Sequence, residues 1–292
     1  MREFTYNYDA KQATTNEELP ILKITKSSLI GSFKWCPKQY DFNYLQKLPQ
    51  DTSEAMMAGS IMHNAYEDWY NDFDVKKAET MSPLEIQDYA LSLFPIDDYT
   101  DFYHTMAAWE TNRFIDSRSE GTLDSFLPVI NEATLDAEVV IRRDESHLPL
   151  RYDHTIHLQG IIDRMFEEEQ GYVPVEFKTG KWGKHKATSM RKEMAFYKWL
   201  FDNTSREDKV KLGLDPDKEI THWAWYFPKN DVFVYEKVKK VSMTGMLKNV
   251  VELLKAYEEE TWEPEYNERT CPAYCSYYSI CDAADNAGWF DI

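Results

Sequence analysis

Two stretches of the sequence decide the fold that it predicts: Gly160-Ile-Ile-Asp-Arg164 and Val175-Glu-Phe-Lys-Thr-Gly-Lys181. Each stretch contains or continues a short apolar run, and the polar residues 167–171 (Glu-Glu-Glu-Gln-Gly) lie between the runs as a turn candidate. Short apolar runs around a polar turn that contains glycine are typical of a β-hairpin or of two adjacent strands. We therefore expect two neighbouring strands in this region.

Three charged residues of these strands form a candidate catalytic group. Side chains alternate between the two faces of a strand, so Glu176 and Lys178 point the same way, and Asp163 on the neighbouring strand can face them. Two carboxylates offer the oxygen ligands that Mg²⁺ or Mn²⁺ prefers. The lysine is suited to orienting a water molecule and to offsetting charge on a phosphate. The alternative is a chance pattern of charges on a solvent-facing strand.

The rest of the chain shows patterns of both helices and strands. A helix is expected to start at residues 25–28 (Thr-Lys-Ser-Ser), because serine and threonine are good N-caps. Further helical patterns cover residues 53–74, 82–93, 97–119, 188–202 and 242–260. Further strands are expected at residues 134–142, 219–227 and 231–238. This order predicts one α/β domain with a helical insertion.

The composition is that of a folded protein. With 292 residues, of which 43% are hydrophobic and 15% aromatic, the chain can bury a substantial core. It has no apolar run of about eighteen residues, and its N-terminus lacks the apolar core of a signal peptide. We therefore expect a cytoplasmic protein without membrane contact, with a loose arm over residues 1–20 and a single domain over residues 21–292.

The net charge of −18 argues against a generally basic nucleic-acid-binding surface. Residues 178–198 reverse this charge locally, because they contain seven lysines and arginines and only one acid, Glu193. A solvated helix and loop are the alternative, but the neighbouring carboxylates favour contact with phosphate groups. Within this segment, Trp182 is the best candidate for stacking on a base.

The four cysteines are interpreted as one set, with Cys36 near one end of the chain and Cys271, Cys275 and Cys281 near the other. In a cytoplasmic protein, closely spaced thiols indicate a metal or cluster site more than disulfides. Both iron–sulfur clusters and structural zinc ions bind four thiolates, and either would tie the two ends of the domain together. The spacing lacks the C-x2-C pairs of common zinc sites, so it favours a cluster over zinc, and unligated thiols are the third interpretation.

These motifs together resemble the PD-(D/E)XK nucleases, specifically the RecB-like branch with an iron–sulfur cluster, which includes the AddB nuclease domain and CRISPR-adaptation nucleases. The similarity runs from about Ile24 to Cys281. It rests on several motifs, which are residues 27–40, Gly59-Ser-Ile-Met-His63, Gly160-Ile-Ile-Asp163, Glu176-Phe-Lys178, residues 191–197 and the C-terminal cysteines.

The resemblance implies a restriction-endonuclease-like fold, with a mixed central sheet flanked by helices and a C-terminal cysteine cluster. It also implies a metal-dependent DNA exonuclease that acts on ends or single strands. The catalytic residues would be Asp163, Glu176 and Lys178. The ligands of Mg²⁺ or Mn²⁺ would be His63, Asp163 and Glu176. The residues in contact with DNA would be Lys181, Trp182, Arg191, Glu193 and Tyr197. The ligands of a [4Fe–4S] cluster would be Cys36, Cys271, Cys275 and Cys281.

The sequence departs from the family pattern at two points. Glu193 stands where the family more often has glutamine, and three residues rather than two separate Cys271 from Cys275.

Without the resemblance, a lone helical histidine such as His63 is more often structural. Glu67, one turn further along the same helical face, is a candidate to orient His63 or to help bind metal. Glu138 is a weaker candidate for a supporting role.

Two other functions are compatible with these observations. A non-catalytic nucleic-acid-binding module of the same fold would not need Asp163, Glu176 and Lys178. An iron–sulfur sensor is disfavoured by the separation of the cysteines from the acidic group. As a nuclease the protein would take part in repair, recombination or mobile-element DNA processing, with possible protein partners in a recombination, repair or adaptation complex. The sequence lacks the motif G-x4-G-K-[ST], which predicts a stand-alone nuclease and not a helicase fusion.

Overall fold

The computed structural model describes residues 21–50, 53–144 and 149–285, so the arm expected over residues 1–20 lies outside the described residues. The chain divides into two compact units that are each discontinuous in sequence. Unit 1 comprises residues 1–52, 136–160 and 240–292, and unit 2 comprises residues 53–135 and 161–239. The strands β2 (Ile130–Ile141) and β3 (His154–Glu168) contribute to both units. The single domain expected over residues 21–292 stays a prediction.

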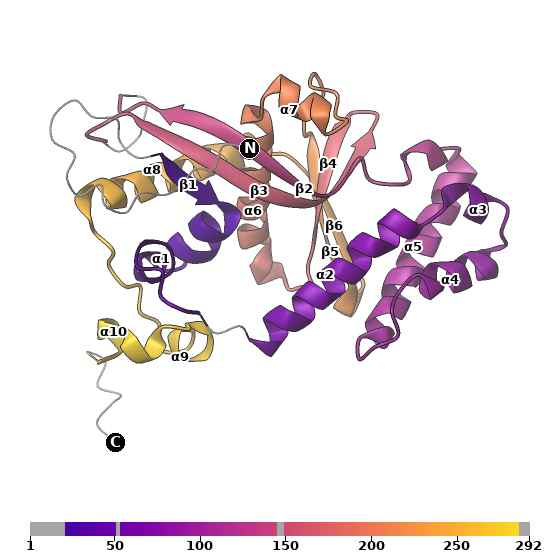
Figure 1. Ribbon diagram of the computed structural model, residues 1–292, viewed down its shortest axis with the longest axis horizontal. Helices are drawn as coiled ribbons and strands as arrows, with labels where there is room; N and C mark the ends of the chain where they lie inside the picture. The colour runs from indigo at the N-terminus through magenta and orange to yellow at the C-terminus, as the bar shows by residue number, and fades with distance from the viewer. Residues whose placement is uncertain (1–20, 51–52, 145–148, 286–292) are drawn as a thin grey trace. The chain divides into compact units, whose positions relative to one another are not determined.

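Unit 2 contains a mixed sheet, formed by the second half of β3, β4 (Gly171–Phe177), β5 (His222–Phe227) and β6 (Val232–Lys237) (Figure 1). β3 and β4 are antiparallel, β4 and β5 are parallel, and β5 and β6 are antiparallel. The mixed sheet and the predicted pairing of the two motif strands are therefore confirmed.

The turn between β3 and β4 requires a glycine. The ladder closes with Glu168 opposite Gly171, whose φ is 142°. A Cβ atom at this position would lie 2.5 Å from the carbonyl oxygen of Glu219. Only glycine combines this backbone conformation with so close an approach of the backbone that precedes β5.

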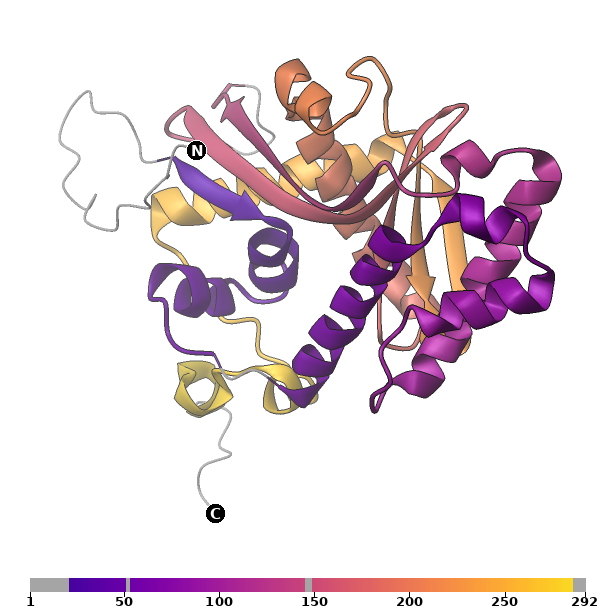
Figure 2. The same cartoon turned by 45° about the vertical axis from the view of Figure 1, so that its right-hand side comes forward.

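Two helices of unit 2, α2 and α4, begin at side-chain caps that the sequence supplies. Ser53 accepts a hydrogen bond from the backbone N–H of Met56 at the start of α2, and Ser82 and Glu85 form a reciprocal cap at the start of α4. The helices are α2 (Glu54–Asp72), α3 (Val75–Glu79), α4 (Pro83–Ser92), α5 (Thr100–Glu120), α6 (Ala187–Asn203) and α7 (Arg206–Lys211). Short 3-10 turns are η4 (Leu123–Ser125), η5 (Lys184–Lys186) and η6 (Pro228–Asn230). Figures 1 and 2 show α3, α4 and α5 grouped together as the predicted helical insertion.

The two faces of this sheet are covered by different helices. Phe177 points toward α2, where its ring lies 5.0 Å from the ring of Tyr66. Glu176, the preceding residue, points to the opposite face and is hydrogen-bonded by Tyr197 of α6. Helices therefore flank the sheet of unit 2 on both sides, as predicted.

Unit 1 is built around the first half of β3 and the N- and C-terminal segments. β1 (Leu22–Thr25) pairs in parallel with β3, with Leu22 opposite Ile156. Thr25 and Ser28 exchange side-chain hydrogen bonds with each other's backbone N–H groups, which confirms the predicted helix start. The helical segments of this unit are η2 (Ser27–Phe33), α1 (Pro37–Tyr40), η3 (Asp41–Leu45), α8 (Lys240–Glu259), α9 (Cys271–Tyr274), η7 (Tyr278–Ile280) and α10 (Asp282–Asp285). Among the described residues of the whole chain, no helix has the length and apolar character needed to cross a membrane.

Candidate metal and catalytic site

The site begins where β3 and β4 separate. Their ladder runs as far as Arg164 opposite Val175. Just beyond this pair, the backbone N–H of Phe177 donates to the Oδ2 atom of Asp163 at 2.8 Å. The carboxylate of Asp163 therefore lies at the end of the β3–β4 ladder. Its side chain is buried, and the hydrogen bond from Phe177 fixes its orientation.

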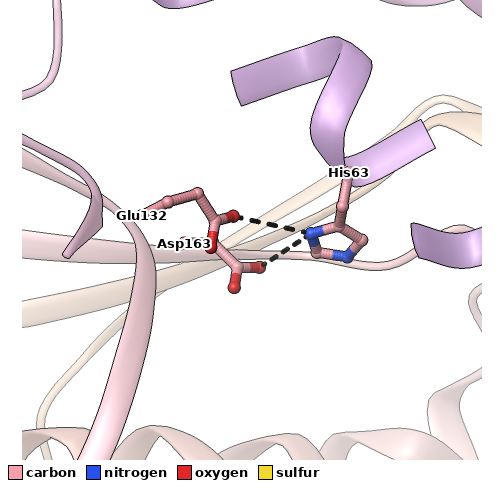
Figure 3. A group of neighbouring side chains, drawn as sticks. All are labelled: His63, Glu132 and Asp163. Atoms are coloured by element: carbon pink, nitrogen blue, oxygen red, sulfur yellow. Dashed lines mark ion pairs between the residues drawn. The ribbon is translucent and has the colours of Figure 1, made fainter. Parts of the chain in front are cut away.

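Helix α2 brings His63 to this carboxylate. The Nδ1 atom of His63 lies 3.9 Å from Oδ2 of Asp163 and 3.7 Å from Oε1 of Glu132 (Figure 3). The imidazole ring contacts the Phe177 ring edge-to-face at 4.8 Å, which restrains its position. One ligand atom from each of His63, Glu132 and Asp163 lies within 4.8 Å of the other two. One nitrogen and two carboxylate oxygens are a donor set suited to a divalent cation.

Glu132 was not identified from the sequence. It lies at the start of β2 with φ of 54°, a conformation that is uncommon for residues other than glycine. The preceding Asn131 donates to the backbone carbonyl of Glu67 and to the side chain of Asn71, which ties this part of β2 to α2. The Oε1 atom of Glu132 is buried and accepts no hydrogen bond from a described residue. A buried carboxylate oxygen of this kind fits the role of a metal ligand.

Lys178 and Glu176 face the same way, as the strand pattern predicts. The Nζ atom of Lys178 donates to Oε1 of Glu176 at 2.7 Å and to Oε2 of Glu193 at 2.9 Å. Burial lowers the pKa of Lys178, but the two carboxylates raise it more, so the net shift is upward. The lysine is therefore a protonated hydrogen-bond donor at neutral pH.

Tyr197 holds Glu176 from the side of α6. Its hydroxyl is buried and hydrogen-bonded to Glu176. Burial raises the pKa of Tyr197 well above its usual value, and the carboxylates of Glu176 and Asp163 raise it further. The hydroxyl is therefore neutral and acts as a donor. Glu193 and Tyr197, both expected to contact DNA, contact the candidate catalytic residues Lys178 and Glu176.

The other residues that were expected to contact DNA lie in different surroundings. Lys181 is exposed. Trp182 is half-buried, with its ring 5.2 Å from that of Phe227, which leaves less of it for stacking on a base. Arg191 donates to Glu236 through two nitrogens, one of them at 2.7 Å, so a carboxylate already engages its guanidinium.

Glu67 and Glu138, the two acidic residues considered for a supporting role, lie in different surroundings. Glu67 is partly buried on α2, and its pKa is raised by burial and, second, by the carboxylate of Glu132. Glu138 is exposed, six residues beyond Glu132 along β2. It is therefore Glu132, and not Glu138, that β2 contributes to the group around His63.

The four cysteines line one small pocket in unit 1. The backbone N–H of Glu265 donates to Sγ of Cys36 at 3.4 Å, and that of Asn267 donates to Sγ of Cys271 at 3.2 Å. Burial raises the pKa of Cys275, and the other three thiols raise it further. Among the described residues, however, no three sulfur atoms approach one another as closely as the ligand atoms around His63 do. The thiols therefore do not form the compact group that a single zinc ion would need, because Zn–S bonds of about 2.3 Å place sulfur atoms about 3.8 Å apart.

Comparisons with known proteins address the family. The family model for the PD-(D/E)XK nuclease superfamily matches residues 28–282. No curated protein matches the sequence. Among solved structures, the chain is similar to the one titled "Crystal structure of SSO0001", at 12% identity and a TM-score of 0.43, over 93% of this chain and 90% of that chain. A structural similarity at this level supports no inference about function.

Proposed function

Because the chain belongs to the PD-(D/E)XK nuclease superfamily, we propose that it is a metal-dependent deoxyribonuclease that hydrolyses phosphodiester bonds. The observation that carries the proposal is the group formed by His63 of α2, Glu132 of β2 and Asp163 of β3, because Asp163 lies on the strand that pairs with β4, where Glu176 stands two residues before Lys178. A structural or purely binding role would not require three possible metal ligands within 4.8 Å of one another, or a lysine that donates to two carboxylates.

The proposed cation is Mg²⁺ or Mn²⁺, held by His63, Asp163 and Glu176 together with Glu132. A cation bound there would supply Lewis-acid chemistry, which polarises a phosphate group and makes water a better nucleophile at neutral pH. The buried oxygen of Glu132 and the fixed orientation of Asp163 support this assignment. The carboxylates of Glu132 and Asp163 and the imidazole of His63 already lie within 4.8 Å of one another, and Glu176 is proposed as a further ligand because the family pattern implies it.

The proposed role of Lys178 follows from its contacts. As a protonated ammonium it donates hydrogen bonds and adds positive charge where negative charge develops on the phosphate. Glu193 and Tyr197 act through other residues, since Glu193 positions Lys178 and Tyr197 positions Glu176. They are proposed as positioning residues and not as groups that react.

The proposed substrate is DNA, cleaved from its ends or as single strands. Exposed Lys181 and Lys184 follow the lysine motif directly and offer positive charge to a phosphate backbone. The pathway proposed for such an enzyme is repair, recombination or mobile-element processing, as in the RecB-like branch that the motifs resemble.

The direct test is cleavage of end-labelled linear and closed circular DNA, each single- and double-stranded, in Mg²⁺, Mn²⁺ or EDTA. We expect metal-dependent cleavage of linear DNA, lost by at least 100-fold in Asp163→Asn and Lys178→Ala. The matched control is Asp68→Asn, an exposed aspartate on α2, which should cleave as the wild type does. Full activity of Asp163→Asn would reject the site. Binding of DNA without cleavage by the wild type would favour a non-catalytic binding module.

We also propose that Cys36, Cys271, Cys275 and Cys281 hold a structural [4Fe–4S] cluster. The convergence of all four thiols on one pocket supports this, and so do the two backbone N–H groups directed at sulfur, a feature that tunes such clusters. A cluster distributes its thiolates over four iron atoms, so it needs wider spacing than one zinc ion. Iron and sulfide analysis of anaerobically purified protein should give four of each, and Cys275→Ser should lower both. Zinc without iron would reject the cluster.

A further inference from the structure

The first half of α2 carries two exposed methionines on the helix that also supplies His63. Met56 is 53% exposed and Met57 is 49% exposed, although methionine is most often a core residue. Single exposed apolar side chains are common on protein surfaces, so exposure alone does not indicate a role. The position of Met56 relative to His63, which the geometry of the helix determines, is what distinguishes it.

Met56 lies on the face of α2 that presents His63. The two residues are seven positions apart, and with about 3.6 residues per turn this spacing places them on the same face, about 10 Å apart along the helix axis. Gly59 lies between them on this face, and a Cβ atom there would lie 3.6 Å from the Oγ1 atom of Thr179. This face of α2 is therefore next to the segment that follows Lys178.

The other large apolar side chains exposed on this part of α2 point elsewhere. Each residue of an α-helix is turned by about 100° from the one before it. Met57 therefore points about 120° away from the direction of His63, and Ile61, which is also exposed, points about 160° away. Met56 points within about 20° of that direction. It is the one of these three side chains that shares the face of His63.

The charges next to this face of α2 favour a strand of nucleic acid. Glu54 is the only charged residue of α2 before His63, and a spacing of nine residues places it on the opposite side of the helix. Residues 179–192 contain no acid, and Lys181 and Lys184 among them are exposed. The apolar face of α2 and a basic segment therefore meet beside the candidate metal site.

A single strand of DNA has a charged edge, formed by its phosphates, and an apolar side, formed by the faces of its bases. Its phosphates would lie at the cation and at the exposed lysines. The acids of the site, Glu132, Asp163 and Glu176, are those proposed to bind the cation. In a duplex, neighbouring base pairs cover the faces of each base, so an apolar side chain gains contact area only from a base that is unstacked. The flexible, polarizable side chain of methionine suits contact with an aromatic ring.

We propose that Met56 contacts an unpaired base of the substrate strand, beside the phosphate bound at the metal group, and thereby gives the site a preference for unpaired nucleotides. The inference rests on the proposed function, because it takes the strand to run along α2 from a phosphate at His63. The separation of about 10 Å along the helix assigns the contact to a base close to the scissile phosphate.

The test compares two strands of equal charge, single-stranded (dT)20 and a strand of the same length in which abasic residues replace the bases. Their affinities are measured by fluorescence anisotropy in EDTA, so that no cleavage occurs. Met56→Gln keeps the length and the helix propensity of methionine but removes its apolar end, and Met57→Gln is the matched control on the other face. We expect Met56→Gln to lower the ratio of the two affinities at least threefold, and Met57→Gln to stay within about 1.5-fold of the wild-type ratio. Met56→Leu, which keeps an apolar side chain, should retain most of the wild-type ratio.

The proposal is overturned if the two glutamine variants lower the ratio equally, if Met56→Leu lowers it as much as Met56→Gln, or if the wild type does not prefer (dT)20 to the abasic strand. Because the ratio compares two ligands of the same variant, a loss of folded protein does not change it. A wild type that binds (dT)20 but does not cleave it in Mg²⁺ or Mn²⁺ rejects the nuclease. A wild-type ratio in Met56→Gln, together with cleavage by the wild type, rejects the base contact alone.

Discussion

At the scale of single residues, the position of the Lys178 ammonium group depends on its hydrogen bonds to both Glu176 and Glu193. Glu193→Gln keeps an oxygen that accepts the hydrogen bond, so we expect cleavage within about threefold of the wild-type rate. Glu193→Leu removes a hydrogen bond to a charged group, which contributes about 1.5–3 kcal/mol. We expect its single-turnover cleavage rate to fall roughly 10- to 100-fold.

The control for this pair is Glu79→Leu, which removes an exposed glutamate of α3. It should leave the cleavage rate unchanged. If Glu193→Leu also cleaved at the wild-type rate, Glu193 would have no role in positioning Lys178.

Glu67 gives a prediction about pH at the same scale. Its pKa is raised by burial and by Glu132, so ionisation of Glu67 opposes folding at neutral pH. Because the folded state raises this pKa, the stability falls as the pH rises from the unfolded-state pKa, near 4.5, through the higher folded-state pKa. Glu67→Gln should therefore raise the melting temperature at pH 7.5, with a gain that shrinks as pH falls to 5.5. The melting temperatures are measured on metal-free protein, and Asp88→Asn, at an exposed position on α4, is the control. A gain independent of pH would contradict the assignment.

The alternation of side chains along strands was enough to predict that Glu176 and Lys178 face the same way, while the shared catalytic role of these residues with Asp163 stays a prediction. It was not enough to find Glu132, because the contact with His63 joins residues far apart in sequence and needs a backbone conformation with positive φ. The spacing of residues along a helix also does not predict which acid pairs with Arg191. The structure shows that it is Glu236.

At the scale of elements, the β3–β4 turn determines where Asp163 and Glu176 meet. Gly171→Ala would place a Cβ atom 2.5 Å from a backbone oxygen at a φ of 142°. We expect a loss of about 1–3 kcal/mol in the free energy of unfolding, measured by urea denaturation. Gly59→Ala in α2 is the control with the opposite sign, because its Cβ meets only Thr179 at 3.6 Å. It should add about 0.5–1 kcal/mol. Equal effects would contradict the strain argument.

The long helices and strands were predictable because a periodic pattern of apolar residues is clearer over more residues. The helical pattern over residues 53–74 and the strand pair of the two motifs correspond to α2 and to β3 with β4. The short elements were missed for physical reasons. β1 has four residues, too few for a periodic signal, and α7 has no apolar stripe. α7 depends instead on the Ser205 cap and on ion pairs of Lys211 with Glu207 and Asp208.

At the scale of the whole molecule, the net charge of −18 opposes binding of DNA. The affinity nevertheless depends on the lysines and arginines that lie next to the bound phosphates. Salt screens charges beyond about 8 Å at physiological ionic strength, so distant acids matter little to a phosphate at the site. Lys181 and Lys184 are exposed next to the lysine motif. If each contacts one phosphate of a single strand, Lys181→Ala/Lys184→Ala should reduce the slope of log affinity against log salt by roughly 1.4.

The matched control is Lys76→Ala/Lys248→Ala, which changes the net charge by the same amount at exposed positions on α3 and α8. Affinity for (dT)20 in EDTA, measured by fluorescence anisotropy over a range of salt concentrations, should keep the wild-type slope in this control. Equal slopes for the two double variants would mean that the total charge governs binding. A smaller slope in the first variant alone would mean that local contacts outweigh the repulsion of the acidic chain, because counterions are released only where phosphates are neutralised.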